Sequence, residues 1–173
     1  MQMEHTLETT RLRLRPCQRG DIHRVHGLWT NDRVRHFLFD DRVISLEEAG
    51  SFLESSLANF EKYGYGLWLI FTRASQCLVG FGGFLHVTED APHLIYGILP
   101  RYWGLGYATE AASALLRYAF ESLSLAKVKA DVDEPNVASV RVLEKLGMKR
   151  VHRAIVRGRP LVYYERCFGE GAG

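Results

Sequence analysis

A glycine-containing turn in the second half of the chain constrains the fold more than any other feature. This turn follows the apolar, strand-like run 94–99 and carries Gly104, Gly106 and Ala108 at alternate positions. It leads into the longest helical pattern of the chain, and a second strand-like run, 127–132, comes after that pattern. A strand, a helix and a second strand in this order predict a right-handed parallel crossover, with the glycines at the start of its helix.

The remaining sequence predicts further strands and helices around this unit. Short runs rich in branched or aromatic residues, bounded by turn formers, indicate strands. Helix starts are indicated by capping residues or by the onset of helical spacing. The expected strands are 10–15, 66–72, 78–87, 94–99, 127–132, 150–156 and 161–167, and the expected helices begin at Asp21, Ser45, Gly104 and Pro135. This order predicts an α/β (α+β) fold in which helices cover both faces of a mixed sheet.

The size and composition of the chain favour one globular domain. The 173 residues suffice for a single core, and 47% apolar with 24% charged residues is ordinary for a globular protein. We expect a single domain over residues 1–173, with its core at about 7–167 and a flexible tail at 168–173. Lys and Arg total 22 against 20 Asp and Glu, so no excess of basic charge points to nucleic acid.

Cysteine usage and apolar runs bear on the compartment. The three cysteines, Cys17, Cys77 and Cys167, are widely spaced and form no Cys-x-x-Cys pair, so no metal site is expected. Free thiols fit a reducing compartment. The first ten residues lack the apolar core of a signal peptide, and the apolar run 67–71 is too short to span a membrane. The expected location is the cytoplasm, without a membrane partner.

The glycine turn allows two interpretations. The first amides of a helix lack intrahelical acceptors and lie at the positive end of its dipole, so small residues there let a phosphate approach. The glycines could instead serve only the dihedral angles of a tight turn. A P-loop is excluded because no lysine occurs between Lys62 and Lys127. A dinucleotide fingerprint would need a third glycine where Thr109 stands.

The segment Trp103-Gly104-Leu105-Gly106-Tyr107-Ala108 resembles the acyl-CoA signature of the GNAT acetyltransferase superfamily, Q/R-x-x-G-x-G/A. Trp103 occupies the Gln/Arg position of that signature. The continuation 108–111 resembles the ribosomal-protein N-terminal-acetyltransferase branch, the RimJ/RimL type. Segments 9–16, 28–32 and 136–148 resemble the opening strand, an early substrate-side loop and the second motif of this branch. The resemblance covers nearly the whole chain, from about residue 7 to residue 167.

The resemblance implies a mostly antiparallel sheet of seven strands, splayed between the fourth and fifth, with acetyl-CoA as co-substrate and no metal. The pantetheine arm would lie in the splay, near Gly97, Ile98 and Leu99. An amide near Ile98 would polarise the acetyl carbonyl. Gly97 could equally be a bulge residue. By the same resemblance, the pyrophosphate would be held by the amides of Trp103, Gly104, Leu105, Gly106, Tyr107 and Ala108, and Asn136 would contact the pantetheine besides capping its helix.

Two residues are candidates for proton transfer. His93 lies at the start of strand 94–99, where many relatives carry a glutamate, and imidazole suits a general base; the alternative is a surface histidine. Ser139 matches a hydroxyl that the branch uses toward the CoA sulfur, whereas Leu143 stands where many GNAT enzymes have an acid tyrosine. Ser139 could instead only bond the backbone at the start of its helix. Weaker candidates for the base are His86, Glu89, Asp90 and Tyr164.

These features predict an N-acetyltransferase that joins acetyl-CoA and a primary amine in a ternary complex for direct attack. A protein N-terminal α-amine is the first choice of acceptor. A small amine, such as a polyamine, an amino acid or an antibiotic, is the alternative. An acyl-CoA-binding regulatory module without turnover is the alternative of another class. The expected assembly is a monomer or a homodimer.

Overall fold

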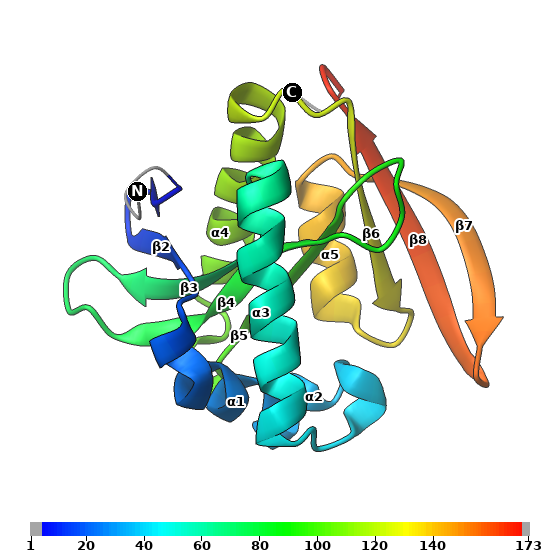
Figure 1. The fold of residues 1–173 in the computed structure, drawn as a ribbon. Coiled ribbons are helices and arrows are strands. Elements are labelled where there is room, and N and C mark those ends of the chain that lie inside the picture. The colour runs from blue at the N-terminus through cyan, green and yellow to red at the C-terminus, as the bar shows by residue number, and fades with distance from the viewer. Residues whose placement is uncertain (1–4, 171–173) are drawn as a thin grey trace.

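The computed structural model describes residues 5–170, and within them eight strands form one sheet in the order β1-β2-β3-β4-β5-β6-β8-β7 (Figure 1). Every neighbouring pair is antiparallel except β5 and β6. The expected mixed, mostly antiparallel sheet is therefore confirmed. The strands are β1 (Leu7–Glu8), β2 (Leu12–Pro16), β3 (Leu67–Thr72), β4 (Leu78–Leu85), β5 (His93–Ile98), β6 (Lys127–Asp133), β7 (Lys149–Val156) and β8 (Arg159–Cys167).

The strand that the sequence did not indicate is β1, so the expected number of seven was one too low. Its two residues pair with Leu14 and Arg13 of β2. Two residues are too few to show the alternation by which a strand is recognised in a sequence. The closing hairpin is confirmed, and its second strand, β8, lies between β6 and β7.

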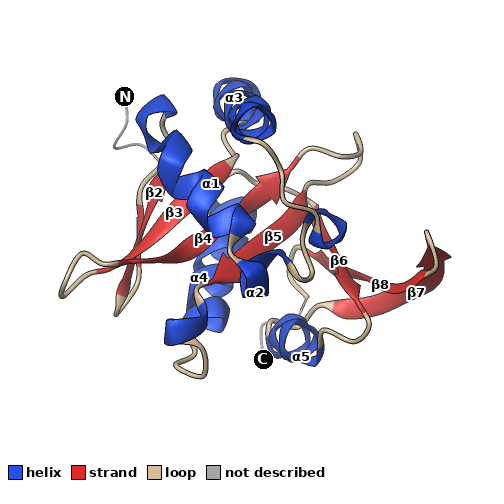
Figure 2. Ribbon diagram, turned by 90° about the horizontal axis from the view of Figure 1, so that it is seen from below, coloured by secondary structure: helices blue, strands red, loops and turns tan. Residues whose placement is uncertain are grey.

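Helices cover both faces of the sheet, as Figure 2 shows. α1 (Ile22–Thr30) and α3 (Leu46–Tyr63) pack together on one face over a core that includes Leu69 and Phe81. On the other face, α4 (Tyr107–Arg117) and α5 (Val137–Lys145) cover a core that includes Ile70 and Phe84. A four-residue helix, α2 (Asp32–Arg35), follows α1 and was not indicated by the sequence. Asn31 stabilises its first turn by accepting the amides of Arg33 and Val34.

The two glycines of the turn decide where α4 begins. The helical pattern suggested a start at Gly104, but the helix begins at Tyr107. Gly104 and Gly106 have φ angles of +76° and +80°, which belong to the left-handed region and cannot continue a right-handed helix. At its other end α4 widens into a π-type turn over Tyr118–Ser122.

The expected splay between the fourth and fifth predicted strands is confirmed between β5 and β6. Only one residue pair, His93 with Lys129, is in register, and the Lys129 amide donates to the Pro92 carbonyl at 3.0 Å. Beyond this pair the two strands diverge. The edge of β5 that faces β6 is thus left without a ladder partner toward Ile98.

Three further sequence features concern the described residues. The three cysteines carry free thiols, and burial raises the pKa of Cys17 to about 12. In the expected tail, the Phe168 amide donates to Ala126 and Glu170 pairs with Lys149, while residues 171–173 lie outside the described range. Within residues 5–170, no helix is long and apolar enough to cross a membrane, and no three His, Cys, Asp or Glu side chains are grouped to hold a metal ion.

Candidate active site

A cavity of about 200 Å³ opens where β5 and β6 splay apart. Its walls come from β5, β6 and the start of α5, and the segment 37–39 closes one side. His93, Asn136 and Ser139, three residues that the sequence singled out, all line this cavity. The splay therefore brings both proton-transfer candidates to one place.

Ser139 forms a hydrogen-bonded pair with Tyr96 of β5. The Ser139 Oγ lies 2.7 Å from the Tyr96 hydroxyl oxygen, and Tyr96 also donates to the Ser139 carbonyl at 3.3 Å. Burial raises the pKa of Tyr96 to about 12, although the Ser139 hydrogen bond opposes this effect. Tyr96 therefore stays protonated at neutral pH and can donate a proton to the serine oxygen.

Asn136 caps α5, as the sequence indicated. Its Oδ1 accepts the backbone amide of Ser139 at 3.2 Å. The Ser139 side chain is directed to Tyr96 instead of to the backbone at the helix start. Asn136 therefore caps the helix, whereas the Ser139 hydroxyl pairs with Tyr96.

His93 is held by Asp131 of β6. Its Nδ1 lies 3.2 Å from an Asp131 carboxylate oxygen, and the imidazole is only 13% exposed. Its Nε2 is buried and has no hydrogen-bond partner within residues 5–170. A charged imidazolium would leave a buried N–H unsatisfied there, so the neutral ring that donates through Nδ1 fits this environment.

The glycine turn presents the first amides of α4, and Arg11, the residue before β2, fixes its shape. The amides of Tyr107 and Ala108 lie in the first helical turn, where no carbonyl of the helix can accept them. Arg11 donates to the Leu105 carbonyl at 2.8 Å and to the Glu110 carboxylate at 2.7 Å. Its guanidinium also lies over the Tyr107 ring, 4.6 Å from the centroid.

Trp103 connects the turn to the end of β5. Its indole Nε1 donates to the Ile98 carbonyl at 2.7 Å, and its amide donates to Pro100 at 3.1 Å. That amide is therefore already bonded, in contrast to the expectation that it holds phosphate. The Leu99 amide donates to β4, and because ladder bonds alternate along an antiparallel strand, the Ile98 amide points toward the splay.

Gly97 is not a bulge residue. It pairs regularly with Phe81 of β4, and the β4–β5 ladder has no register shift. A Cβ at this position would come within 2.5 Å of the Phe81 ring and 3.3 Å of Val34. The glycine is required because these side chains approach the backbone of β5.

The other residues considered for the general base do not line the cavity. His86 is stacked on Tyr63 and bonded to Tyr65 and Glu89. Asp90 is paired with Lys129 at 2.6 Å. Tyr164 is buried among apolar side chains on the α4 face. Leu143, in the position of the missing tyrosine, is buried and contributes an apolar wall.

Sequence reasoning missed three groups that the fold brings to this site: Tyr96, the turn-holding Arg11, and the acidic pair Asp131 and Asp133. For Arg11 a signal was present, because its partner Glu110 lies in the segment 108–111 that continues the signature. For Tyr96 and the two aspartates no local pattern distinguishes them from ordinary strand residues. Asp133 also lines the cavity, and burial raises the pKa of its carboxyl although Arg159 opposes the shift.

The residues around the turn fit an acyl-CoA. Gly104 has open space where a side chain would stand, and at Gly106 the nearest atom belongs to Arg11, 3.4 Å away. Small residues beside unbonded helix amides suit a pyrophosphate. The splayed edge of β5, with the Ile98 amide directed into it, leads from this turn to the cavity.

Comparison with known proteins agrees with this geometry. The family model described as acetyltransferase (GNAT) domain matches residues 11–149. The uncharacterised N-acetyltransferase YoaA of Bacillus subtilis is 30% identical over 83% of this chain and 82% of its own length. Spermidine N(1)-acetyltransferase of Escherichia coli is 27% identical over 86% of this chain and 80% of its own length.

Solved structures show the same fold. A GNAT-family acetyltransferase from Bordetella pertussis superposes with a TM-score of 0.82 at 22% identity, covering 94% of this chain and 99% of its own. RimL, a ribosomal alpha-N-protein acetyltransferase in complex with coenzyme A, gives a TM-score of 0.80 at 18% identity, covering 94% and 98%. From the family match and the N-acetyltransferase relatives together, the chain belongs to the GNAT acetyltransferase family and is an acyl-CoA-dependent N-acyltransferase.

Proposed function

We propose that this protein acetylates the α-amine of a peptide or protein N-terminus, in the manner of the RimJ/RimL branch. The observation that carries this proposal is the Ser139–Tyr96 hydroxyl pair, which lies in the wall of a cavity beside the splayed strands. A hydroxyl there can protonate a thiolate leaving on one side of the splay while the amine enters from the other.

Each part of the site has a task in this proposal. Bound acetyl-CoA would supply a thioester carbonyl as the electrophile. The amides of Gly104 to Ala108 hold its pyrophosphate. Trp103 holds the glycine turn against the end of β5 through the hydrogen bond from its indole to the Ile98 carbonyl. The Ile98 amide stabilises the oxyanion. Ser139 donates its proton to the sulfur, Tyr96 reprotonates Ser139, and solvent in the cavity reprotonates Tyr96. Asn136 fixes the start of α5 and contacts the pantetheine.

His93 is the proposed base, with Asp131 as the residue that orients it. In the tautomer that donates its Nδ1–H to Asp131, Nε2 carries no proton and can accept one. Because this nitrogen is enclosed, a small rotation of the ring or a bridging water must connect it to the amine. A peptide α-amine has a pKa of about 7.7–8.0, so a sizeable fraction is neutral without help.

A small cationic amine is the second candidate for the acceptor. Two observations favour it: the relative that acts on spermidine, and the carboxylates of Asp131 and Asp133 in the cavity wall. An ammonium group entering the cavity would meet negative charge, as would a peptide N-terminus. The two candidates differ in the number of positive charges that the acceptor carries.

The test is thiol release from acetyl-CoA across a panel of amines at neutral pH. The panel contains a short peptide with a free N-terminus, the same peptide blocked at its N-terminus but carrying a lysine, and spermidine. We expect the fastest release with the free N-terminal peptide. A higher rate with the blocked lysine peptide or with spermidine would overturn the choice of acceptor, and no release with any amine would favour a binding module without turnover.

A further inference from the structure

Two carboxylates on neighbouring positions of the same strand face define the charge of the cavity. Asp131 and Asp133 lie two residues apart on β6, so both side chains are on one face of the sheet, and both line the cavity. The Asp131 side chain is 43% exposed and that of Asp133 only 12%. An acceptor ammonium that enters here is stabilised only by a carboxylate that is not already neutralised.

Asp131 has no arginine or lysine partner among residues 5–170. Its partner in the cavity is His93, whose ring is neutral in the arrangement described above, because a second N–H would be buried without an acceptor. A hydrogen bond from a neutral imidazole leaves the carboxylate free to balance one positive charge. Asp131 can therefore pair with one ammonium group of an acceptor.

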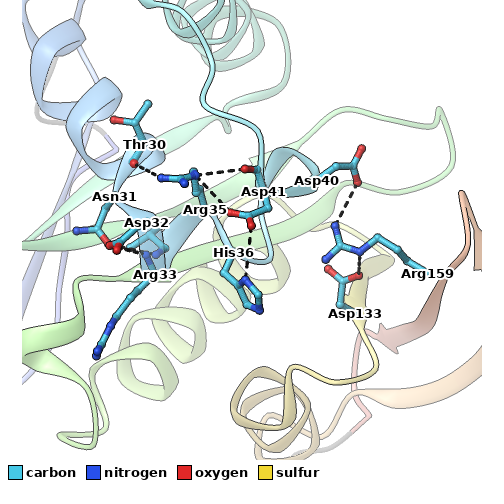
Figure 3. A network of polar contacts seen from close by, with 11 residues as sticks. Thr30, Asn31, Asp32, Arg33, Arg35, His36, Asp40, Asp41, Asp133 and Arg159 are labelled. Carbon is cyan, nitrogen blue, oxygen red and sulfur yellow. Dashed lines mark hydrogen bonds and ion pairs between the residues drawn. The ribbon is translucent and has the colours of Figure 1, made fainter.

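Asp133 is already neutralised by Arg159 of β8. The Arg159 Nε lies 3.3 Å from an Asp133 carboxylate oxygen, and its Nη1 lies 3.7 Å from Asp40 (Figure 3). Arg159 thus lies between a carboxylate of the cavity wall and one of the segment that covers the cavity. We name residues 37–41 the cover segment; its first three residues, 37–39, line the cavity.

The cover segment is fixed in place, and its own carboxylates are occupied. Phe39 packs on Trp29 and Phe52, with ring centroids 6.0 Å and 5.1 Å away. The backbone of the cover segment has left-handed φ angles of 53°, 54° and 59° at residues 39–41, and Asp40 contacts Arg159. Asp41 is paired with Arg35 at 3.3 Å and with His36 at 3.8 Å. Asp131 is therefore the one carboxylate among these four whose charge no arginine balances.

We propose that Arg159 is a specificity-determining residue, which restricts the cavity to acceptors with one positive charge by occupying the carboxylates that a second ammonium group would need. This inference rests on the proposed function, in which the cavity receives the amine. A peptide N-terminus brings one ammonium group and pairs with Asp131. A polyamine would have to displace a guanidinium that contacts both Asp133 and Asp40, or bury a second charge unpaired.

The experiment compares acceptors in the full-length protein. The ratio of kcat/KM for spermidine to that for a lysine-free peptide with a free N-terminus is measured in wild type and in Arg159→Gln. We expect the ratio to rise by about tenfold or more in Arg159→Gln, because one charge-assisted hydrogen bond changes an equilibrium by about that factor. Arg159→Lys keeps the positive charge and is expected to keep the wild-type preference.

The matched control is Arg157→Gln in the same hairpin. Arg157 also contacts Asp40, at 3.1 Å, but its side chain is 81% exposed and no contact joins it to Asp133. This variant should leave the ratio within about twofold of wild type, given the small contribution of exposed ion pairs. Melting temperature and the CoA-induced melting shift are measured for each variant, so that a folding defect is recognised as such.

The outcomes separate the inference from the proposed function. An unchanged ratio in a folded, active Arg159→Gln protein would overturn the role of Arg159 alone. An equal rise in Arg157→Gln would do the same, because the effect would then not depend on Asp133. Absence of thiol release with both acceptors, in a wild-type protein that still binds CoA, would instead overturn the proposed function.

Discussion

The side-chain oxygens of Ser139 and Tyr96 lie 2.7 Å apart, so α5 and β5 share one hydrogen-bonded hydroxyl pair in the wall of the cavity. Proton donation by Ser139 to a leaving thiolate would leave an alkoxide, and the adjacent phenol can supply a proton to it. The raised pKa of Tyr96, about 12, keeps this phenol protonated. The pair is thus suited to act as one unit in proton transfer.

Ser139→Ala is expected to lower kcat and kcat/KM together, by about 10²–10⁴-fold, with little change in acetyl-CoA affinity. Its melting temperature should change little, because Asn136 provides the cap of α5. Tyr96→Phe removes the partner and keeps the ring, so a smaller loss of kcat is expected. Steady-state kinetics and thermal melting on the same preparations test this, and normal turnover in Ser139→Ala would rule out the catalytic role.

CoA and acetyl-CoA are expected to stabilise the protein against unfolding. At about 100 times the dissociation constant, the ligand should add about 2.7 kcal/mol. NAD and ATP should add much less, because the glycine turn is not a dinucleotide fingerprint or a P-loop. Thermal melting with each ligand measures the effect. Equal shifts with all of them would contradict a specific acyl-CoA site.

Gly106→Val is expected to reduce the CoA-induced melting shift. The branched side chain would enter the place where the phosphates approach and would press on Arg11, 3.4 Å from an added Cβ. Its φ of +80° makes any side chain costly, so a control for backbone strain is required. Gly158→Val, at φ +77° with open space around it, provides that control. A loss of the CoA shift in both variants would point to strain alone.

Arg11→Ala is expected to raise the KM for acetyl-CoA by about tenfold, the effect of losing a hydrogen bond from a charged donor. Without Arg11, the Leu105 carbonyl and the Glu110 carboxylate lose the contacts that fix the glycine turn. Arg13→Ala is the matched control, since Arg13 lies two residues further along the chain, in β2, and its side chain has only a long 3.9 Å contact with Glu8 within residues 5–170. A similar KM in both variants would contradict a role of Arg11 in positioning the turn.

Asp133→Asn is expected to gain stability relative to wild type as pH rises from about 4 to 7. Burial, only partly opposed by Arg159, raises the pKa of the Asp133 carboxyl in the folded protein above its usual value of about 3.9. The folded state therefore binds this proton more tightly than the unfolded state, and the associated stability is lost as pH rises through the folded pKa. Denaturant unfolding of both proteins across this range measures the difference. A variant that becomes relatively less stable toward neutral pH would contradict the raised pKa.

The sequence by itself determined most of the strands and helices and the glycine turn before α4. Runs of branched and aromatic residues bounded by turn formers identified the strands other than β1. Capping residues and helical spacing identified four helix starts, because these signals depend on backbone sterics and on hydrogen bonds within a few residues. Gly104 and Gly106 were found for the same reason. Their left-handed φ angles shifted the start of α4 to Tyr107, a local detail that the apolar spacing obscured.

The tertiary structure alone decided which side chains meet at the site. Tyr96 reaches Ser139 across 43 positions, and Arg11 reaches Glu110 across 99, so no local pattern could pair them. The cavity exists because β5 and β6 share one residue pair and then diverge, an arrangement of two strands that lie about 30 residues apart in the chain. The pairing of Arg159 with Asp133 depends on β8 lying between β6 and β7. Short-range sterics and hydrogen bonds are encoded locally, whereas charges and hydroxyls are brought together only by long-range packing.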